Sequence, residues 1–424
     1  MIKKTRIISV ILLSCILSLN FSKSLTTYAD SSALNYDSKY DINHDSIINK
    51  LDIDEISKHY NTQKDSPNWT EKFDFNNDGI IDIFDIIKIS KRNGIKKPEK
   101  KLSKNALELQ NLLSANKNVT TAKDEAGKTI YNVWVKGITP PSENDFTDID
   151  LGNDYSIKVA PWKSGQGWYD INKVRGDSGD DLLCSGAVAT NMLHWWFDQN
   201  NEFINKYLSQ GMENGKNIAK DLDIRTSSTF HNQQNSDIFN LIKKFFGHNK
   251  PIWTDRTLLW YLNGFNMDFS PGQNYGSPHI DQRGGFFHDI FKSIDIIDRS
   301  TVTKFDVLNM RLLQWLKEDR ALGIAHKTFS ATTNHIITVW GTSFDENGTL
   351  IGIYTTDSDD GSFKMSDGSP YGMRYSKVIK DSNGLARITN YNGKNNNIGA
   401  RTLELFSFSL ERDKWEEYFN KDNN

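Results

Sequence analysis

The spacing of apolar and polar positions divides the chain into four segments. An apolar run covers residues 7–21. In residues 36–93, apolar residues recur at helical spacing after each of two loops rich in Asp and Asn. Residues 94–128 are rich in Lys, Glu, Asn and Leu, which is typical of a linker with one helix. From residue 129 to residue 424, strand-like stretches and helical runs alternate without a regular βαβ rhythm, which predicts an α+β domain.

The first apolar run is typical of an export signal. Three basic residues within the first six positions precede it, and a polar stretch ending at Ala29 follows it. The alternative is a membrane anchor, but the run is shorter than the roughly 20 apolar residues that a spanning helix needs. We therefore expect residues 1–29 to be a signal peptide and the protein to be secreted. Lipoprotein processing at Cys15 is the less favoured alternative.

The composition of the chain narrows the function classes further. Two cysteines, Cys15 and Cys184, occur in 424 residues, which excludes a disulfide-stapled scaffold and a zinc fold with several cysteines. The net charge of −3 argues against nucleic acid as a partner. The sequence has no GxGxxG or Walker loop, which disfavours nucleotide chemistry.

Two loops, residues 41–52 and 74–85, repeat one pattern 33 residues apart. Oxygen-bearing side chains at loop positions one, three, five, nine and twelve, with the carbonyl at position seven, form the ligand set that Ca²⁺ prefers. The alternative is a pair of ordinary surface turns, which the tandem repetition disfavours. The expected ligands are Asp41, Asn43, Asp45, Ile47, Asn49, Asp52, Asp74, Asn76, Asp78, Ile80, Asp82 and Asp85.

Asp at position twelve and a single helix after each loop resemble the type I dockerin module over residues 36–93. The resemblance implies a small all-α, Ca²⁺-dependent domain that docks onto a cohesin. Ser46 stands at position six, where Gly eases the turn, so the first site is expected to be the weaker one. The cohesin-facing positions ten and eleven carry Lys50-Leu51 and Ile83-Phe84 where Ser or Thr is common.

Cys184 is the candidate nucleophile. Apolar residues after it recur at helical intervals, and Asp180 and Asp181 suit the cap or first turn, so we expect Cys184 near a helix N-terminus. The helix dipole favours a thiolate there, and the small residues 185–187 leave room for a substrate. The alternative is a buried structural cysteine, which is the commoner fate of a lone Cys.

A cysteine nucleophile needs a histidine and usually a third group that orients the histidine. His335 begins a predicted strand, and a turn at Asn347-Gly348 returns the chain to Asp357 and Asp359. The hairpin register places His335 opposite these two acids without choosing between them. His326 is the rival base, but no acid is placed near it by comparable geometry.

Several sequence blocks closely resemble the secreted immunoglobulin-degrading cysteine endopeptidases of the IdeS/Mac type. The resemblance spans residues 129–424 and implies a papain-like fold. The blocks that carry it are residues 133–141, 166–173, 180–184, 191–200, 283–285 and 334–359.

The resemblance implies a role for each candidate residue. Cys184 would be the nucleophile, and His335 would be the general base and later the acid. Asp357 would orient the imidazole, and Asp359 would be a second, supporting acid. Lys173 would help the Cys184 N–H group to hold the oxyanion. No cofactor is expected for catalysis, whereas Ca²⁺ is expected to be structural in the dockerin-like module.

These roles predict a secreted endopeptidase that cuts immunoglobulin heavy chains, most favourably at an IgG-type hinge, through a thioester acyl-enzyme. A cohesin-bearing partner would retain the enzyme at the cell surface through the dockerin-like module. A papain-like protease of another host protein is the second hypothesis. A non-catalytic immunoglobulin-binding decoy is the third, and a transglutaminase-like acyl transferase is the fourth.

Overall fold

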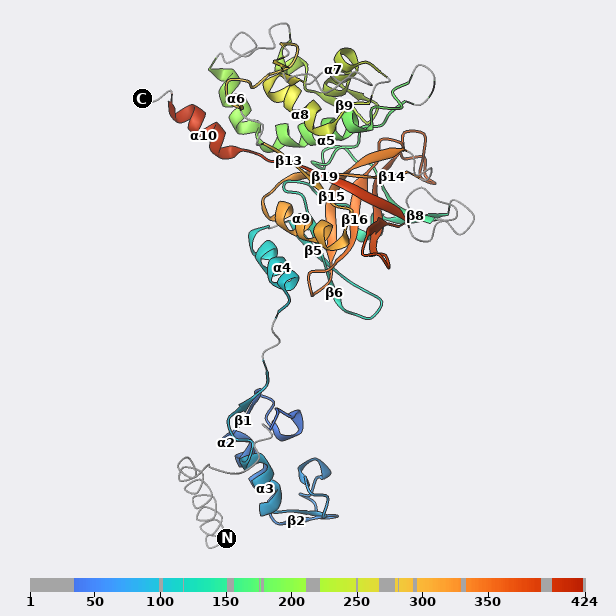
Figure 1. Cartoon of the computed structure of the whole chain (residues 1–424). Helices are drawn as coiled ribbons and strands as arrows, with labels where there is room; N and C mark the ends of the chain where they lie inside the picture. Colours follow the sequence, from blue (N-terminus) through green and yellow to red (C-terminus); the bar gives the residue numbers. More distant parts are fainter. Residues whose placement is uncertain are drawn as a thin grey trace. The chain divides into compact units, whose positions relative to one another are not determined.

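The chain forms two compact units, Met1–Lys101 and Leu102–Asn424 (Figure 1). The predicted signal peptide lies outside the described residues, and none of the described helices is long and apolar enough to cross a membrane. The computed structural model describes residues 34–98, 102–116, 118–150, 156–174, 176, 179–210, 222–248, 251–266, 279–280, 282–292, 296–328, 333–389 and 399–421.

The N-terminal unit contains helices α2 (Lys50–Ser57) and α3 (Ile83–Ser90), one after each predicted Ca²⁺ loop. Asn49 and Asp82 cap these helices through matching capping boxes. Each loop also contributes a two-residue strand. The unit therefore does not have the all-α architecture that the sequence predicted. The elements are β1 (Ile47–Ile48), β2 (Thr62–Gln63), β3 (Ile80–Ile81), β4 (Ile95–Lys96), and the short helices η2 (Ser38–Tyr40) and η3 (Glu71–Phe73).

The strand pairing of this unit follows the sequence repeat. Strand β1 pairs with β4, and β3 pairs with β2, so each loop is joined to the segment that follows the other loop's helix. Ile48 and Ile81, at position eight of the two loops, are completely buried in the shared core. The two loops therefore pack on one shared core formed around α2 and α3, so each loop helps to hold the other in place.

The second unit is built around a closed ring of antiparallel strands. The ring runs β15 (Asn334–Phe344), β14 (Ala321–Lys327), β19 (Ala400–Phe408), β18 (Ala386–Ile388), β17 (Tyr371–Lys380), β16 (Leu350–Thr356) and back to β15. Further strands extend it: β5 (Val119–Lys123), β6 (Thr129–Trp134), β7 (Thr147–Asp150), β8 (Ser156–Pro161) and β13 (Ile297–Thr301). The ring is a β-barrel, because no strand in it is left with an unpaired edge.

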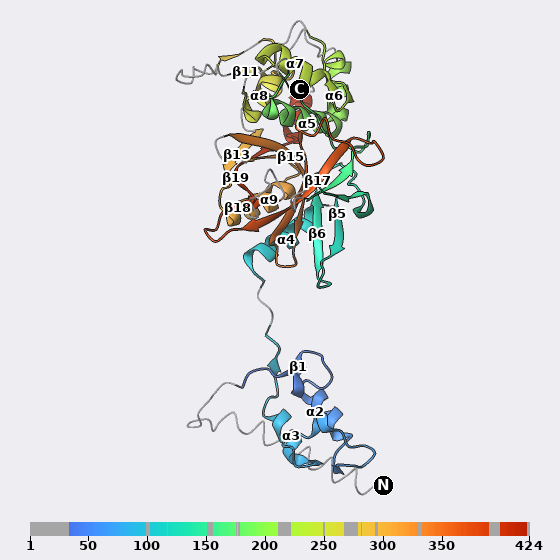
Figure 2. The same cartoon turned by 90° about the vertical axis from the view of Figure 1, so that its right-hand side faces the viewer.

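Most helices of the second unit gather at one end of the barrel (Figures 1 and 2). They are α5 (Cys184–Gln199), α6 (Asn201–Ser209), α7 (Asp237–Phe246), α8 (Thr254–Asn263) and α10 (Arg412–Lys421). The short elements η5 (Ile224–Thr226), β9 (Phe230–Asn232), β10 (Asn235–Ser236), β11 (Phe265–Asn266) and β12 (His279–Ile280) lie between them in sequence, and η4 (Glu143–Asp145) precedes β7. The second unit thus combines helices and strands, as the α+β prediction expected.

Part of the expected linker contributes to the second unit. Helix α4 (Lys104–Ala115) packs against α9 (Phe305–Lys317), and it buries Leu109 and Leu112 in the main core. Strand β5 pairs with β6 along its whole length. The second unit therefore begins at Leu102 and not at Thr129, because α4 packs against α9 and β5 pairs with β6.

Helix α5 is the central support of the site. Its residues from Gly186 to Trp196 are all buried, which is typical of a helix enclosed on every side. Trp196 stacks on Phe408 of the barrel strand β19, with 5.9 Å between ring centroids. Replacing such a buried Trp with Ala typically costs about 3–5 kcal/mol. This packing anchors the C-terminal half of α5, the helix that begins at Cys184, against the barrel.

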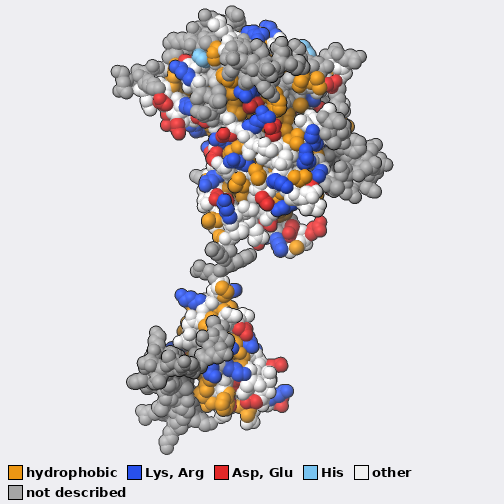
Figure 3. Space-filling view, in the orientation of Figure 1, with side chains coloured by type: hydrophobic (Ala, Val, Ile, Leu, Met, Phe, Trp, Pro, Cys, Tyr) orange, Lys and Arg blue, Asp and Glu red, His pale blue; other side chains and the backbone are white. Residues whose placement is uncertain are grey.

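The surface carries charges of both signs. On the face shown in Figure 3, basic and acidic side chains are interspersed over the described parts of both units. This mixture agrees with the small net charge of −3, and a single-sign surface on that face is not seen.

Candidate active site

Cys184 is the first residue of α5 and is partly buried. Leu183 is the N-cap residue and offers no side-chain hydrogen bond, so the expectation that Asp180 or Asp181 caps the helix is wrong. Asp180 instead accepts a hydrogen bond from Val174 N at 2.6 Å. Cys184 therefore stands at the N-terminus of α5, where the helix dipole favours a thiolate.

His335 faces Cys184 from the barrel. It is the second residue of β15, and its ring lies close enough to the Cys184 side chain for each group to shift the pKa of the other. The predicted hairpin forms: β15 pairs with β16 so that Thr338 faces Thr356, and the chain then runs directly into Asp357. The register thereby brings the acids to the histidine.

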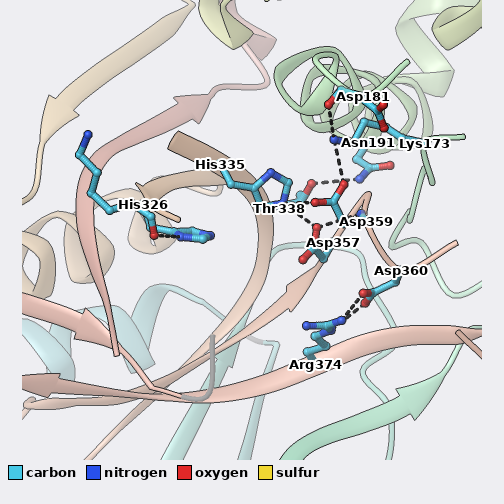
Figure 4. Close-up of polar contacts among 11 residues, drawn as sticks. Lys173, Asp181, Asn191, His326, His335, Thr338, Asp357, Asp359, Asp360 and Arg374 are labelled. Carbon is cyan, nitrogen blue, oxygen red and sulfur yellow. Dashed lines mark hydrogen bonds and ion pairs between the residues drawn. The ribbon is translucent and has the colours of Figure 1, made fainter. Parts of the chain in front are cut away.

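The two acids take different positions around His335 (Figure 4). His335 Nε2 lies 2.7 Å from Asp357 Oδ1 and 3.8 Å from Asp359 Oδ2. Because a carboxylate only accepts, Nε2 carries the hydrogen in the 2.7 Å bond. This leaves Nδ1 as the ring nitrogen that can face Cys184. Asp357 is buried, whereas the Asp359 side chain is 29% exposed.

Lys173 completes the group of expected site residues. Its Nζ atom lies 2.8 Å from Asp359 Oδ1 and donates to the carbonyl oxygen of Asp181 at 2.8 Å (Figure 4). The backbone N–H of Lys173 also donates to Ser358 O at 2.8 Å. The structure therefore brings His335, Asp357, Asp359 and Lys173 into one connected network, with Cys184 beside it.

The charges in this network favour a thiolate beside an imidazolium. Burial raises the pKa of Cys184, but the hydrogen bond and charge of His335 and the charge of Lys173 outweigh it, so the pKa is lowered overall. Burial alone would lower the pKa of His335, yet Asp357 and Cys184 raise it to about 10. Both shifts favour the ion pair of thiolate and imidazolium over the neutral pair, and the thiolate is the nucleophilic form of the sulfur.

Two residues that sequence reasoning missed connect the helix to the barrel. Asn191, about two turns after Cys184, donates to Thr338 Oγ1 on β15 at 3.0 Å. Asn191 Oδ1 also accepts from Ile171 N at 2.9 Å. These bonds fix the helix that carries Cys184 against the strand that carries His335. Asn191 falls inside one of the family-like blocks, which was the signal available in the sequence.

Two further buried acids, Asp360 and Asp170, lie near Asp357. Asp360 forms a bidentate ion pair with Arg374 on β17, with Nε 2.7 Å from Oδ2. Burial raises the pKa of Asp360 to about 7, against the opposing effect of Arg374. Asp170 is also buried, its pKa lies well above the usual range because of that burial, and Gln233 Nε2 donates to it at 2.6 Å. These buried side chains pack beside the loop that carries Asp357.

His335, Asp357 and Asp359 are also close enough to hold a metal ion, and within the described residues they form the one such His/Cys/Asp/Glu group. The Lys173 ammonium already neutralises Asp359, and the His335 Nε2 hydrogen already occupies Asp357. The network is thus satisfied by hydrogen bonds and ion pairs.

The predicted Ca²⁺ loops have a fitting donor set. Asp41, Asp52 and Asp85 are at most 1% exposed, although carboxylates are rarely buried without a cation or a partner. Burial raises the pKa of Asp85, and the neighbouring Asp74 raises it further, as expected for acids gathered around one point. Ser46 and Gly79, at position six, both have positive φ, which costs more at Ser46. When bound, Ca²⁺ would neutralise these acids.

The sequence matches the Mac 1 family over residues 85–415 and the type I dockerin domain over residues 39–92. The first match covers more than half of the chain, so the protein belongs to the Mac 1 family. The predicted membership of the IdeS/Mac-type immunoglobulin-degrading endopeptidase family, behind a dockerin module, is confirmed. The chain is also similar to the IgM protease of Streptococcus suis (strain P1/7), with 33% identity over 313 residues. That stretch is 72% of this chain, which spans about a quarter (27%) of the length of the relative.

Proposed function

We propose that the second unit is a cysteine endopeptidase of papain-like organisation that cleaves immunoglobulin heavy chains. The observation that carries this proposal is the placement of His335 between the Cys184 thiol and the Asp357 carboxylate. A nucleophile beside a histidine base that a third group orients is the arrangement typical of covalent acyl transfer.

In the first half of the reaction, the Cys184 thiolate attacks the scissile carbonyl carbon and forms a C–S bond. The negative charge moves to the carbonyl oxygen, where the Cys184 N–H group and the Lys173 ammonium stabilise it. Of the three N–H donors of Lys173, two contact Asp359 and Asp181, which fixes the ammonium for this role. The imidazolium of His335 then gives its Nδ1 proton to the leaving amine, and a thioester remains.

In the second half, water hydrolyses the thioester. Neutral His335 takes a proton from the attacking water, the new C–O bond forms, and the C–S bond breaks to return the thiolate. Asp357 accepts the Nε2 hydrogen throughout, which holds the tautomer and stabilises the imidazolium when it forms. No step requires a cofactor, so Ca²⁺ remains a structural ion of the N-terminal unit.

Family membership supports an immunoglobulin substrate. The hinge of an IgG heavy chain is the first candidate, because an extended segment between folded domains can enter a papain-like site. A second candidate is the IgM heavy chain, which the named function of the similar Streptococcus suis protease favours. Digestion of purified IgG, IgM and IgA, read as intact masses of the fragments, separates these candidates. The same experiment with an amine donor detects acyl transfer, and uncut but bound immunoglobulin would indicate a decoy.

The dockerin domain supports an exported protein that is held at a cell surface by a cohesin-bearing partner. Leu51 and Phe84, at position eleven of the two loops, are 57% and 61% exposed. Two equivalent apolar side chains on the starts of α2 and α3 provide the contact surface for that partner. Binding of a cohesin panel by the wild type and by Leu51→Asp/Phe84→Asp tests this assignment.

A further inference from the structure

His326, the rival base in the sequence, lies directly beside the catalytic pair. It is on β14, and the antiparallel register places it opposite His335 on β15. Residues directly opposite each other share one face of a sheet. The two rings meet edge to face, with 5.6 Å between centroids and 84° between planes. His326 is completely buried, on the side of His335 away from Asp357 (Figure 4).

The ring of His326 is itself fixed in place. Its Nδ1 atom lies 3.0 Å from the Lys327 carbonyl oxygen, and because a carbonyl only accepts, Nδ1 carries the hydrogen. The pairing of β14 with β19 shifts register between Ala325 and His326, where His326 comes to face Thr402. Such irregularities re-aim a side chain, and they occur often beside active sites.

The surroundings of His326 keep its ring uncharged. Burial and, to a lesser extent, the charge of His335 lower the pKa of His326 to about 4. The groups that face it are His335 on β15, Asp357 and Asp359 on the loop after β16, and Thr402 on β19. A neutral aromatic ring can contact an imidazolium favourably, whereas a second cation would repel it.

We propose that His326 is a positioning residue that holds the His335 imidazole between its own ring and Asp357, with Nδ1 of His335 turned toward Cys184. The inference rests on the proposed function, because it requires the Cys184–His335 pair. In this role His326 acts through His335 and not on the scissile bond itself. Loss of the ring would let His335 leave the line between Cys184 and Asp357, and a displacement of about 1 Å can cost about 10²-fold in rate.

The test is the rate of Cys184 carboxamidomethylation by iodoacetamide as a function of pH, measured on the full chain by intact mass. His326→Phe keeps the ring and loses the polar anchor, whereas His326→Gln keeps a polar group and loses the ring. We expect His326→Phe to retain fast alkylation at acidic pH. In His326→Gln the reactive thiolate should appear only at higher pH, and kcat on a peptide should fall about 10–100-fold with little change in KM.

His194→Phe is the matched control, because His194 is also buried, has a pKa lowered to about 3 by that burial, and stacks on Tyr169. It should leave the alkylation profile unchanged. A His326→Gln profile equal to that of wild type, or a His326→Phe profile as impaired as that of His326→Gln, would overturn the inference alone. An ordinary thiol profile in the wild-type protein would instead overturn the Cys184–His335 pair, and with it the proposed function.

Discussion

His335 Nε2 lies 2.7 Å from Asp357 Oδ1, and both side chains are buried. Asp359 is 3.8 Å from the same nitrogen and pairs with Lys173. We therefore expect Asp357→Ala to lower kcat/KM more than Asp359→Ala, by up to about 10⁴-fold, as in the analogous serine triad. Steady-state rates on a peptide substrate measure both losses. The reverse ranking would assign the orienting role to Asp359.

The ion pair predicts a wide pH range of activity. The thiolate forms at a pH below the usual range of Cys, because the pKa of Cys184 is lowered. The imidazolium loses its proton only near the His335 pKa of about 10, so activity should fall above that pH. Asp357 raises this pKa, and Asp357→Ala should therefore move the alkaline limb of kcat/KM to lower pH. An unmoved limb would show that another group controls it.

The Asn191–Thr338 bond should couple the helix to the barrel energetically. Asn191→Ala leaves buried polar partners unpaired, so we expect it to lower the free energy of unfolding by about 1–3 kcal/mol and to lower kcat. Thr338→Val removes a single partner and should cost less. Urea unfolding of the two single variants and of the double variant gives the coupling energy. Fully additive losses would mean that the bond contributes nothing of its own.

Calcium binding should be unequal between the two loops. Ser46 at position six has a φ of 72°, a conformation that Gly79 of the second loop adopts without strain. Calorimetry on the full chain should show two sites, with Asp85→Ala removing the tighter and Asp52→Ala the weaker one. Ser46→Gly should strengthen the first site. Equal or reversed affinities would contradict the strain argument.

Chelation should separate the two units functionally. EDTA is expected to remove Ca²⁺ from the N-terminal unit, whose buried acids then repel one another, so its thermal unfolding should shift to lower temperature. Hydrolysis of a peptide should continue, because no proposed step at Cys184 uses the ion. Iodoacetamide should instead stop peptide hydrolysis and leave the thermal unfolding of the N-terminal unit unchanged. Loss of peptide hydrolysis in EDTA that added Ca²⁺ restores would place a metal in the catalytic mechanism.

Local patterns predicted the parts of the molecule that depend on neighbours in sequence. The hairpin from His335 to Asp357 follows from alternation and one turn, and the Ca²⁺ loops follow from spacing alone. The role of α4 was not predictable, because Leu109 and Leu112 pack against α9, about 200 residues away. The Leu183 cap was missed for a different reason: Asp180 accepts a hydrogen bond from Val174 N and does not cap the helix.

The central claim is that Cys184 cuts immunoglobulin heavy chains. The most direct measurement is the intact mass of IgG, IgM and IgA after incubation with the wild-type protein and with Cys184→Ala, whose fold is checked by circular dichroism. We predict that the wild type converts at least one class into Fab-containing and Fc fragments, and that Cys184→Ala leaves every class whole. Fragments of equal mass and yield from both proteins, or immunoglobulins left intact while the wild type hydrolyses another protein, would contradict the account.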